Sequence, residues 1–165
     1  MRVLGIDPGS ETTGWGVVEG DARRYALVDF GTVRANPRER FAARLLKIAS
    51  GVEALIEKFR PDVCAVEEAF FAVNPKTALK LGHVRGVAIV AAVRAGVEVS
   101  EYSPLEVKSA LVGYGRAEKH QVQEMVRLLL GLKEAPEPLD ASDALAVAIC
   151  HINMASTRAR MGMKG

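Results

Sequence analysis

Two short, continuously apolar segments, residues 3–6 and 63–66, are separated by a long segment with helical periodicity. In that segment, apolar residues recur at intervals of three and four from Phe41 to Phe59, and Pro61 ends the pattern. An apolar run that follows a helix is typical of a central strand, buried on both faces and parallel to the strand before the helix. The sequence therefore predicts a strand-helix-strand unit with a right-handed crossover.

Further segments extend this unit into a larger sheet. Residues 14–18 and 25–33 are rich in strand-forming residues and follow residues 2–6 as an antiparallel meander, and residues 97–102 alternate as an outer strand does. Helical patterns cover residues 74–95, 104–111, 117–130 and 140–154. We therefore expect an α/β fold with a five-stranded mixed sheet, its first three strands antiparallel, and helices on both faces.

The chain length and composition agree with one globular domain. Its 165 residues, 49% hydrophobic and 25% charged, exclude disordered and collagen-like classes. We expect residues 1–155 to form a single domain and residues 156–165 to form a basic, flexible tail. Cys64 and Cys150 lack the spacing of a zinc or disulfide motif, so both are predicted to be buried, reduced thiols.

No segment is suited to crossing a membrane. The longest apolar run, residues 86–93, is far shorter than the ~20 residues that a spanning helix needs. The chain begins directly with a strand-like segment and no secretory signal pattern precedes it. We therefore expect a cytoplasmic protein.

Positive charge is unevenly distributed along the chain. The net charge is only +2, but residues 69–97 carry four basic side chains and no carboxylate, and residues 144–165 repeat this bias. The basic side chains of the first stretch are Lys76, Lys80, Arg85 and Arg94. These stretches are either a solvated helix face and a frayed tail, or surfaces that bind an anionic partner.

Four carboxylates are predicted to converge from three segments. Asp7 and Glu67 each end one of the buried parallel strands, at the edge of the sheet where α/β proteins bind ligands. Asp140 and Asp143 are three residues apart, on one face at the start of the last helix. Taken singly, these residues could be a turn residue, a salt-bridged strand end and acids that cap a helix.

Four neighbouring carboxylates repel one another unless cations lie between them, so the cluster indicates bound metal. Oxygen ligands without a histidine or cysteine partner favour Mg²⁺ or Mn²⁺ over zinc. Two such ions can activate a water and stabilise the leaving oxygen in phosphodiester hydrolysis. Basic segments beside an anionic pocket fit a nucleic acid substrate, and the sequence therefore predicts a nuclease.

Several segments resemble one known family. GIDPGSETTGWGVV, VEEAFF, LKLGHVRGVAIVAA, AEKHQVQEMV and DASDALAVAI follow one another in the order found in the RuvC family of Holliday junction resolvases, and the similarity continues to about Ile152. The resemblance implies an RNase H-like fold and an endodeoxyribonuclease that cuts four-way junctions in recombination and repair. It also implies that Asp7, Glu67, Asp140 and Asp143 are the catalytic metal ligands, although some members of the family have His at the position of Asp140.

The resemblance also assigns candidate DNA contacts. The DNA-contacting aromatic of the family falls on Phe70, and its basic residues near the scissile strand fall on Lys108 and Lys119. From the residues alone, Phe70 and its neighbour Phe71 fit either core packing or an exposed stacking position, and both lysines fit an ordinary surface. Additional phosphate contacts are predicted in the first basic stretch, at Lys76, Lys80 and Arg85.

The expected partners follow from the reaction. Two symmetric cuts need two sites, and one chain has one carboxylate cluster, so we expect a homodimer on four-way junction DNA. Gly82 and Gly86 lie on one helix face, which packs either on the chain's own sheet or on a second copy. The resemblance adds the RuvA–RuvB branch-migration complex as a partner.

Three alternatives stay open at this point. The segment IDPGSETTG also resembles the phosphate loop of actin-like and sugar-kinase ATPases, but those proteins need two such domains. Small RNase H-like nucleases that process ribosomal RNA precursors share the opening motif. The third alternative is a junction-binding protein that does not cleave DNA.

Overall fold

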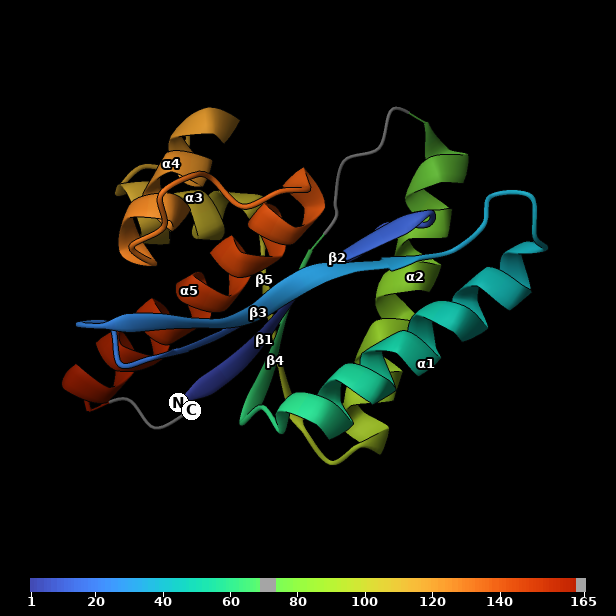
Figure 1. The fold of residues 1–165 in the computed structure, drawn as a ribbon, viewed down its shortest axis with the longest axis horizontal. Helices are drawn as coiled ribbons and strands as arrows, with labels where there is room; N and C mark the ends of the chain where they lie inside the picture. The colour runs from blue at the N-terminus through green and yellow to red at the C-terminus, as the bar shows by residue number, and fades with distance from the viewer. Residues whose placement is uncertain (69–73, 163–165) are drawn as a thin grey trace.

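The computed structural model describes residues 1–68 and 74–162 (Figure 1). Its elements follow the predicted order: β1 (Arg2–Asp7), β2 (Thr12–Gly20), β3 (Tyr25–Arg34), α1 (Phe41–Phe59), β4 (Val63–Glu67), α2 (Pro75–Arg94), β5 (Glu98–Tyr102), α3 (Pro104–Val112), α4 (Lys119–Leu129) and α5 (Leu139–Arg160). The strands form one sheet in the order β3-β2-β1-β4-β5. Strands β1, β2 and β3 pair antiparallel, whereas β4 and β5 run parallel to β1, which confirms the predicted mixed sheet.

Helices cover both faces of the sheet. Figure 1 shows α1 and α2 on one face and α5, flanked by α3 and α4, on the other. Successive side chains of β1 point to opposite faces of the sheet, so each face has its own hydrophobic core. Val3 packs toward α5, whereas Leu4 and Ile6 pack toward α1 and α2. Within the described residues, no helix is long and apolar enough to span a membrane.

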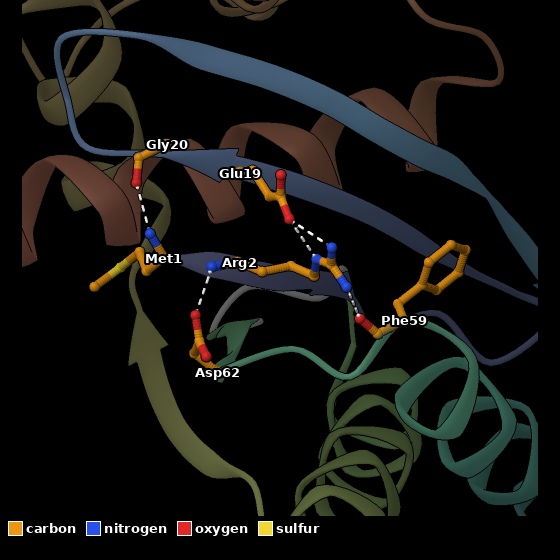
Figure 2. A network of polar contacts seen from close by, with 6 residues as sticks. All are labelled: Met1, Arg2, Glu19, Gly20, Phe59 and Asp62. Atoms are coloured by element: carbon orange, nitrogen blue, oxygen red, sulfur yellow. Dashed lines mark hydrogen bonds and ion pairs between the residues drawn. The ribbon is translucent and has the colours of Figure 1, made fainter.

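The amino end of β1 is held by polar contacts from three neighbouring elements (Figure 2). The Arg2 side chain donates to the Glu19 carboxylate at 2.7 Å and to the Phe59 carbonyl oxygen, and the Arg2 backbone N–H donates to Asp62 at 2.7 Å. These contacts tie β1 to β2, to the end of α1 and to the start of β4. A one-residue slip of β1 would turn the side chains of each face of the strand to the opposite face of the sheet. The network helps to fix the register of β1, and this register determines where Asp7 lies at the other end of the strand.

The helix boundaries show one clear difference from prediction. Asn74 caps α2 by accepting a hydrogen bond from the Thr77 backbone N–H at 2.9 Å. Helix α5, however, continues to Arg160, well past the predicted end at residue 154. Apolar residues stop near Met154, but alanine and arginine favour helix, and the first glycine is Gly162, at a positive φ of 67°. Cys64 and Cys150 are buried free thiols, as predicted.

Candidate active site

Asp7 and Glu67 lie side by side at the carboxyl ends of β1 and β4. These strands are paired in parallel, with Ile6 opposite Val66, so the residue that ends each strand reaches the same level. Each carboxyl group lies close enough to the other to shift its pKa. The predicted convergence of these two strand ends is therefore present in the structure.

Helix α5 brings the other two carboxylates to the same place. Its first turn carries Asp140, and Asp143 follows one turn later with its side chain only 21% exposed. The negative charges of both residues act on Asp7 strongly enough to shift its pKa. The structure thus gathers all four predicted carboxylates, from β1, β4 and α5, at one edge of the sheet.

Glycines in the strands allow α5 to approach this closely. A Cβ atom added at Gly5 would lie 1.9 Å from the carbonyl oxygen of Ala144, and one added at Gly14 would lie 1.9 Å from that of Asp140. Any larger side chain at either position would push the helix away from the sheet. The sequence pattern carries no separate signal for this role, because a strand glycine fits a bulge or a turn equally well.

The pKa values reflect crowding of negative charge in a buried place. Burial is the main cause that raises the pKa of Asp7 to about 8, and repulsion from the other three carboxylates adds to it. Burial and the charge of Asp143 also raise the pKa of Glu67, although Lys119 and Lys108 oppose this shift. A site that disfavours its own negative charges in this way is suited to bind cations.

Two lysines face the carboxylates across a small cleft. The Lys119 ammonium group, at the start of α4, lies 2.7 Å from the Asp143 carboxylate, and this contact raises the lysine's pKa. Lys108 projects from α3 into the same cleft of about 210 Å³, which Glu67 also lines. Both lysines that the family resemblance singled out therefore lie at the carboxylate cluster.

The donor chemistry fits hard divalent cations, because all four side chains offer carboxylate oxygen. Among the described residues, no three carboxylate, histidine or cysteine side chains are already disposed to share one ion. In this arrangement, the ammonium group of Lys119 offsets part of the negative charge. A metal ion would have to displace this ammonium group and draw the carboxylates together.

The other predicted DNA contacts are more dispersed. Lys80 stacks over the Phe41 ring, with its ammonium group 5.8 Å from the ring centroid, while Lys76 is exposed at the start of α2. Arg85 forms ion pairs with Glu101 and, at 3.8 Å, with Glu68. Its charge is thus already paired, and its contact with DNA stays a prediction.

Phe70 and its neighbour Phe71 lie outside the described residues.

One buried residue near the site escaped sequence analysis. Arg44 of α1 is only 6% exposed, and its guanidinium donates to the carbonyl oxygen of Ser10 at 3.0 Å. Ser10 follows Asp7 by three residues, so this contact ties α1 to the loop that begins at the first carboxylate. Arginine is normally exposed, and the helical pattern alone offers no reason to bury it.

A large hollow lies away from the carboxylates. It runs between α1 and α2, has a volume of about 1060 Å³, and is lined mainly by apolar side chains. A Cβ atom added at Gly82 or Gly86 meets nothing within 4 Å in the described structure. These glycines therefore do not serve close packing on the chain's own sheet, which was one of the two interpretations.

Known proteins resemble this chain over nearly its full length. Residues 3–151 match the family described as Crossover junction endodeoxyribonuclease RuvC. The protein of that name from Geobacter sulfurreducens is 55% identical over 155 residues, which cover 94% of each chain. The one from Chloroflexus aurantiacus is 52% identical over 163 residues, which cover 99% of each chain.

A solved structure described as T. thermophilus RuvC in complex with Holliday junction substrate has the same architecture. It matches with a TM-score of 0.90 and 43% identity, over 99% of this chain and 97% of that chain. With more than half of the chain matched by the family, and with the carboxylate cluster formed by its strand ends and last helix, this chain belongs to the RuvC family of crossover junction endodeoxyribonucleases.

Proposed function

We propose that this chain resolves Holliday junctions by Mg²⁺-dependent hydrolysis of two symmetry-related phosphodiester bonds. The main support for this proposal is the meeting of four carboxylates from β1, β4 and α5 beside Lys108 and Lys119. The junction in the T. thermophilus structure is the substrate of a protein 43% identical to this one. Mn²⁺ has the same preference for oxygen ligands and is expected to substitute.

The carboxylates Asp7, Glu67, Asp140 and Asp143 are the proposed metal ligands and catalytic residues. Bound metal supplies an activated water and stabilises charge on the leaving oxygen. The buried strand ends keep Asp7 and Glu67 in a fixed orientation and limit the access of bulk water. Their raised pKa values mean that the site releases protons when it takes up cations.

Lys108 and Lys119 are proposed to contact the scissile strand. Both line the cleft that contains Glu67 and Asp143, so a phosphate at the carboxylates lies within reach of their ammonium groups. Lysine at this place offsets the repulsion between a phosphate and the acidic cluster. Lys76, Lys80 and Arg85 of α2 are proposed as further DNA contacts, and so is Phe70.

The apolar groove between α1 and α2 is the proposed homodimer interface. Leu46, Leu79, Val90 and Val93 are exposed hydrophobic residues of these helices, between 54% and 69% exposed. Open glycines at positions 82 and 86 leave space for a helix of a second copy to approach closely. A two-fold dimer would present two carboxylate clusters to a junction with matching symmetry.

The remaining expectations belong to the same proposal. We infer a cytoplasmic enzyme that acts with the RuvA–RuvB branch-migration complex, on the strength of family membership. Residues 1–155 are proposed to act as a single nuclease domain.

Cleavage of a synthetic four-way junction tests the proposed function. The purified chain should cut the junction in Mg²⁺ and should leave linear duplex DNA and RNA intact under the same conditions. Cleavage of an RNA precursor would favour the ribosomal RNA nucleases. Binding without cleavage at any Mg²⁺ concentration would favour a non-catalytic junction protein.

A further inference from the structure

A second basic surface lies outside the carboxylate cluster and its lysines. Arg34 at the end of β3, Arg38 and Arg40 in the following turn, and Lys47 on α1 are all exposed, and we call these four residues the β3–α1 patch. Within the described structure, none of the four forms an ion pair, whereas Arg2, Arg85 and Arg127 each pair with a carboxylate. The patch therefore carries uncompensated positive charge.

Few negative charges lie near the patch. Residues 34–47 contain a single acidic residue, Glu39, against five basic ones. Arg34 and Lys47 line a shared hollow of about 400 Å³, to which Glu11 adds one carboxylate. Like charges that share a hollow repel one another, so a polyanion that fills it lowers the free energy of the arrangement.

The start of α1 adds to this positive potential. Its N-cap is Arg40, which makes no side-chain capping bond, and no acidic residue lies in the first turn. The first N–H groups of a helix and the positive end of its dipole attract anions. The exposed side chains and the helix start thus act in the same direction.

The patch lies at the same end of the sheet as the candidate active site. Asp7 is opposite Gly14 of β2, which is opposite Thr32 of β3, and Arg34 follows two residues later. With strands ~4.8 Å apart and ~3.3 Å per residue along a strand, the Cα atoms of Asp7 and Arg34 are about 12 Å apart. Figure 1 shows the β3–α1 connection at the end of the sheet where α2 begins.

This separation suits one continuous DNA strand. Nucleotides of a strand advance ~3.4 Å along the helix axis, so about 12 Å corresponds to roughly three to five nucleotides from the cut. Arg44 of the same helix is buried rather than exposed to DNA, and its bond to the Ser10 carbonyl oxygen at 3.0 Å fixes α1 relative to the loop after Asp7. The patch and the first carboxylate are therefore held at a constant spacing.

We propose that the β3–α1 patch binds the phosphate backbone of one junction arm, about three to five nucleotides from the scissile bond. The inference rests on the proposed function, because it needs a junction in the active site. The patch is separate from the basic stretch of α2 and from Lys108 and Lys119. It extends the DNA path across β2 and β3, on the side of the carboxylates opposite to β4.

A salt titration of junction binding tests this contact. In the variant Arg34→Gln/Arg38→Gln/Arg40→Gln, the slope of log affinity against log salt should be smaller by ~0.9 for each lost phosphate contact. If three contacts are lost, a rise from about 50 to 200 mM salt should weaken binding by the parent about 40-fold more than it weakens binding by the variant. Cleavage at saturating enzyme should remain within about twofold of the parental rate, since the patch does not touch the reacting atoms.

The matched control removes the same charge from the opposite end of the sheet. Arg23→Gln/Arg24→Gln/Arg160→Gln changes three exposed arginines near the β2–β3 turn and the end of α5, and it should keep the parental slope. Neutral methylphosphonate linkages about three to five nucleotides from the cut should weaken binding of the parent but not of the patch variant.

The outcomes separate the two proposals. The patch proposal alone is contradicted if the patch variant keeps the parental slope or remains sensitive to the methylphosphonates. An acidic protein would then be the partner that fits this surface. A parental chain that does not bind four-way junctions contradicts the proposed function, and the patch proposal with it.

Discussion

The Lys119 ammonium group lies 2.7 Å from the Asp143 carboxylate, so a lysine of α4 neutralises one of the four clustered carboxylates of the candidate active site. The same lysine lowers the pKa of Glu67 through its charge. Lys119 thus competes with any cation for the carboxylates, while its ammonium group is also available to a bound phosphate.

Replacing this lysine should separate metal binding from cleavage. In Lys119→Gln, Mg²⁺ should bind several-fold more tightly, because a competing positive charge is gone, while single-turnover cleavage should slow at least about tenfold. Calorimetric titration with Mg²⁺ and a quenched-flow cleavage assay measure the two effects. Lys133→Gln, an exposed lysine elsewhere, is the control; weaker metal binding in Lys119→Gln would contradict the competition.

The metal-free protein should lose stability as pH rises. The pKa of Asp7 is about 8 in the folded chain against an ordinary value of 3.8, so its stabilising contribution is complete below the ordinary value and is lost as pH rises through about 8. In EDTA, Asp7→Asn should therefore be more stable than the parent at pH 8, with a smaller difference at pH 5. Urea unfolding at both pH values measures this.

The control for this stability difference is Glu57→Gln, which removes an exposed carboxylate of α1 and should follow the parental pH dependence. If Asp7→Asn is less stable than the parent at pH 8, the carboxylates do not repel one another as described.

Glycine at position 5 should be required for assembly of the site. Gly5→Ala places a Cβ atom 1.9 Å from the Ala144 carbonyl oxygen, so α5 has to shift, at a cost of about 1–3 kcal/mol or more. Asp140 and Asp143 would move with the helix, and Mg²⁺ affinity should fall together with stability. Ser50→Ala, at an exposed position of α1 outside the α1–α2 groove, should be neutral or slightly stabilising.

For Gly5→Ala, urea unfolding and Mg²⁺ titration provide the measurements. If the variant has the parental stability and the parental Mg²⁺ affinity, the sheet tolerates a side chain under α5. That result would contradict the close contact between α5 and β1.

A charge in the α1–α2 groove should prevent dimerisation. Gly86→Glu has space for its side chain within the protomer, so the fold should persist while the apolar groove acquires a negative charge. Sedimentation should give a monomer, with circular dichroism as the test of folding. Leu128→Glu, on the exposed side of α4, is the control that should remain dimeric.

A folded Gly86→Glu variant that sediments as a dimer and makes both cuts together would place the interface on another surface. The four-carboxylate site within one protomer would be unaffected by that result.

The sheet and its carboxylate edge could be predicted because both depend on local pattern. Apolar runs at residues 3–6 and 63–66 indicate buried strands, and the residue that ends each run must lie at the carboxyl edge. The spacing of Asp140 and Asp143 puts both on one face of a helix that begins there. The register of the parallel pair then sets the two strand ends at one level.

Features that depend on contacts between distant segments could not be predicted from pattern. The role of Gly5 and Gly14 appears only when α5 lies on β1 and β2. The burial of Arg44 depends on a backbone carbonyl 34 residues away. The ion pair of Lys119 depends on how α4 packs beside α5, and without the family resemblance its pattern indicates only an ordinary surface lysine.

The most direct test of the metal-site assignment compares cleavage and binding of a four-way junction by the parent, Asp7→Asn and Glu67→Gln in Mg²⁺. We predict that the parent cuts the junction, and that both variants bind it with parental or higher affinity but cut it at least about a thousandfold more slowly. Metal-site chemistry supplies several kcal/mol of transition-state stabilisation, whereas affinity comes mainly from phosphate contacts. Cleavage at the parental rate by either variant would contradict the assignment of that carboxylate to the catalytic metal site.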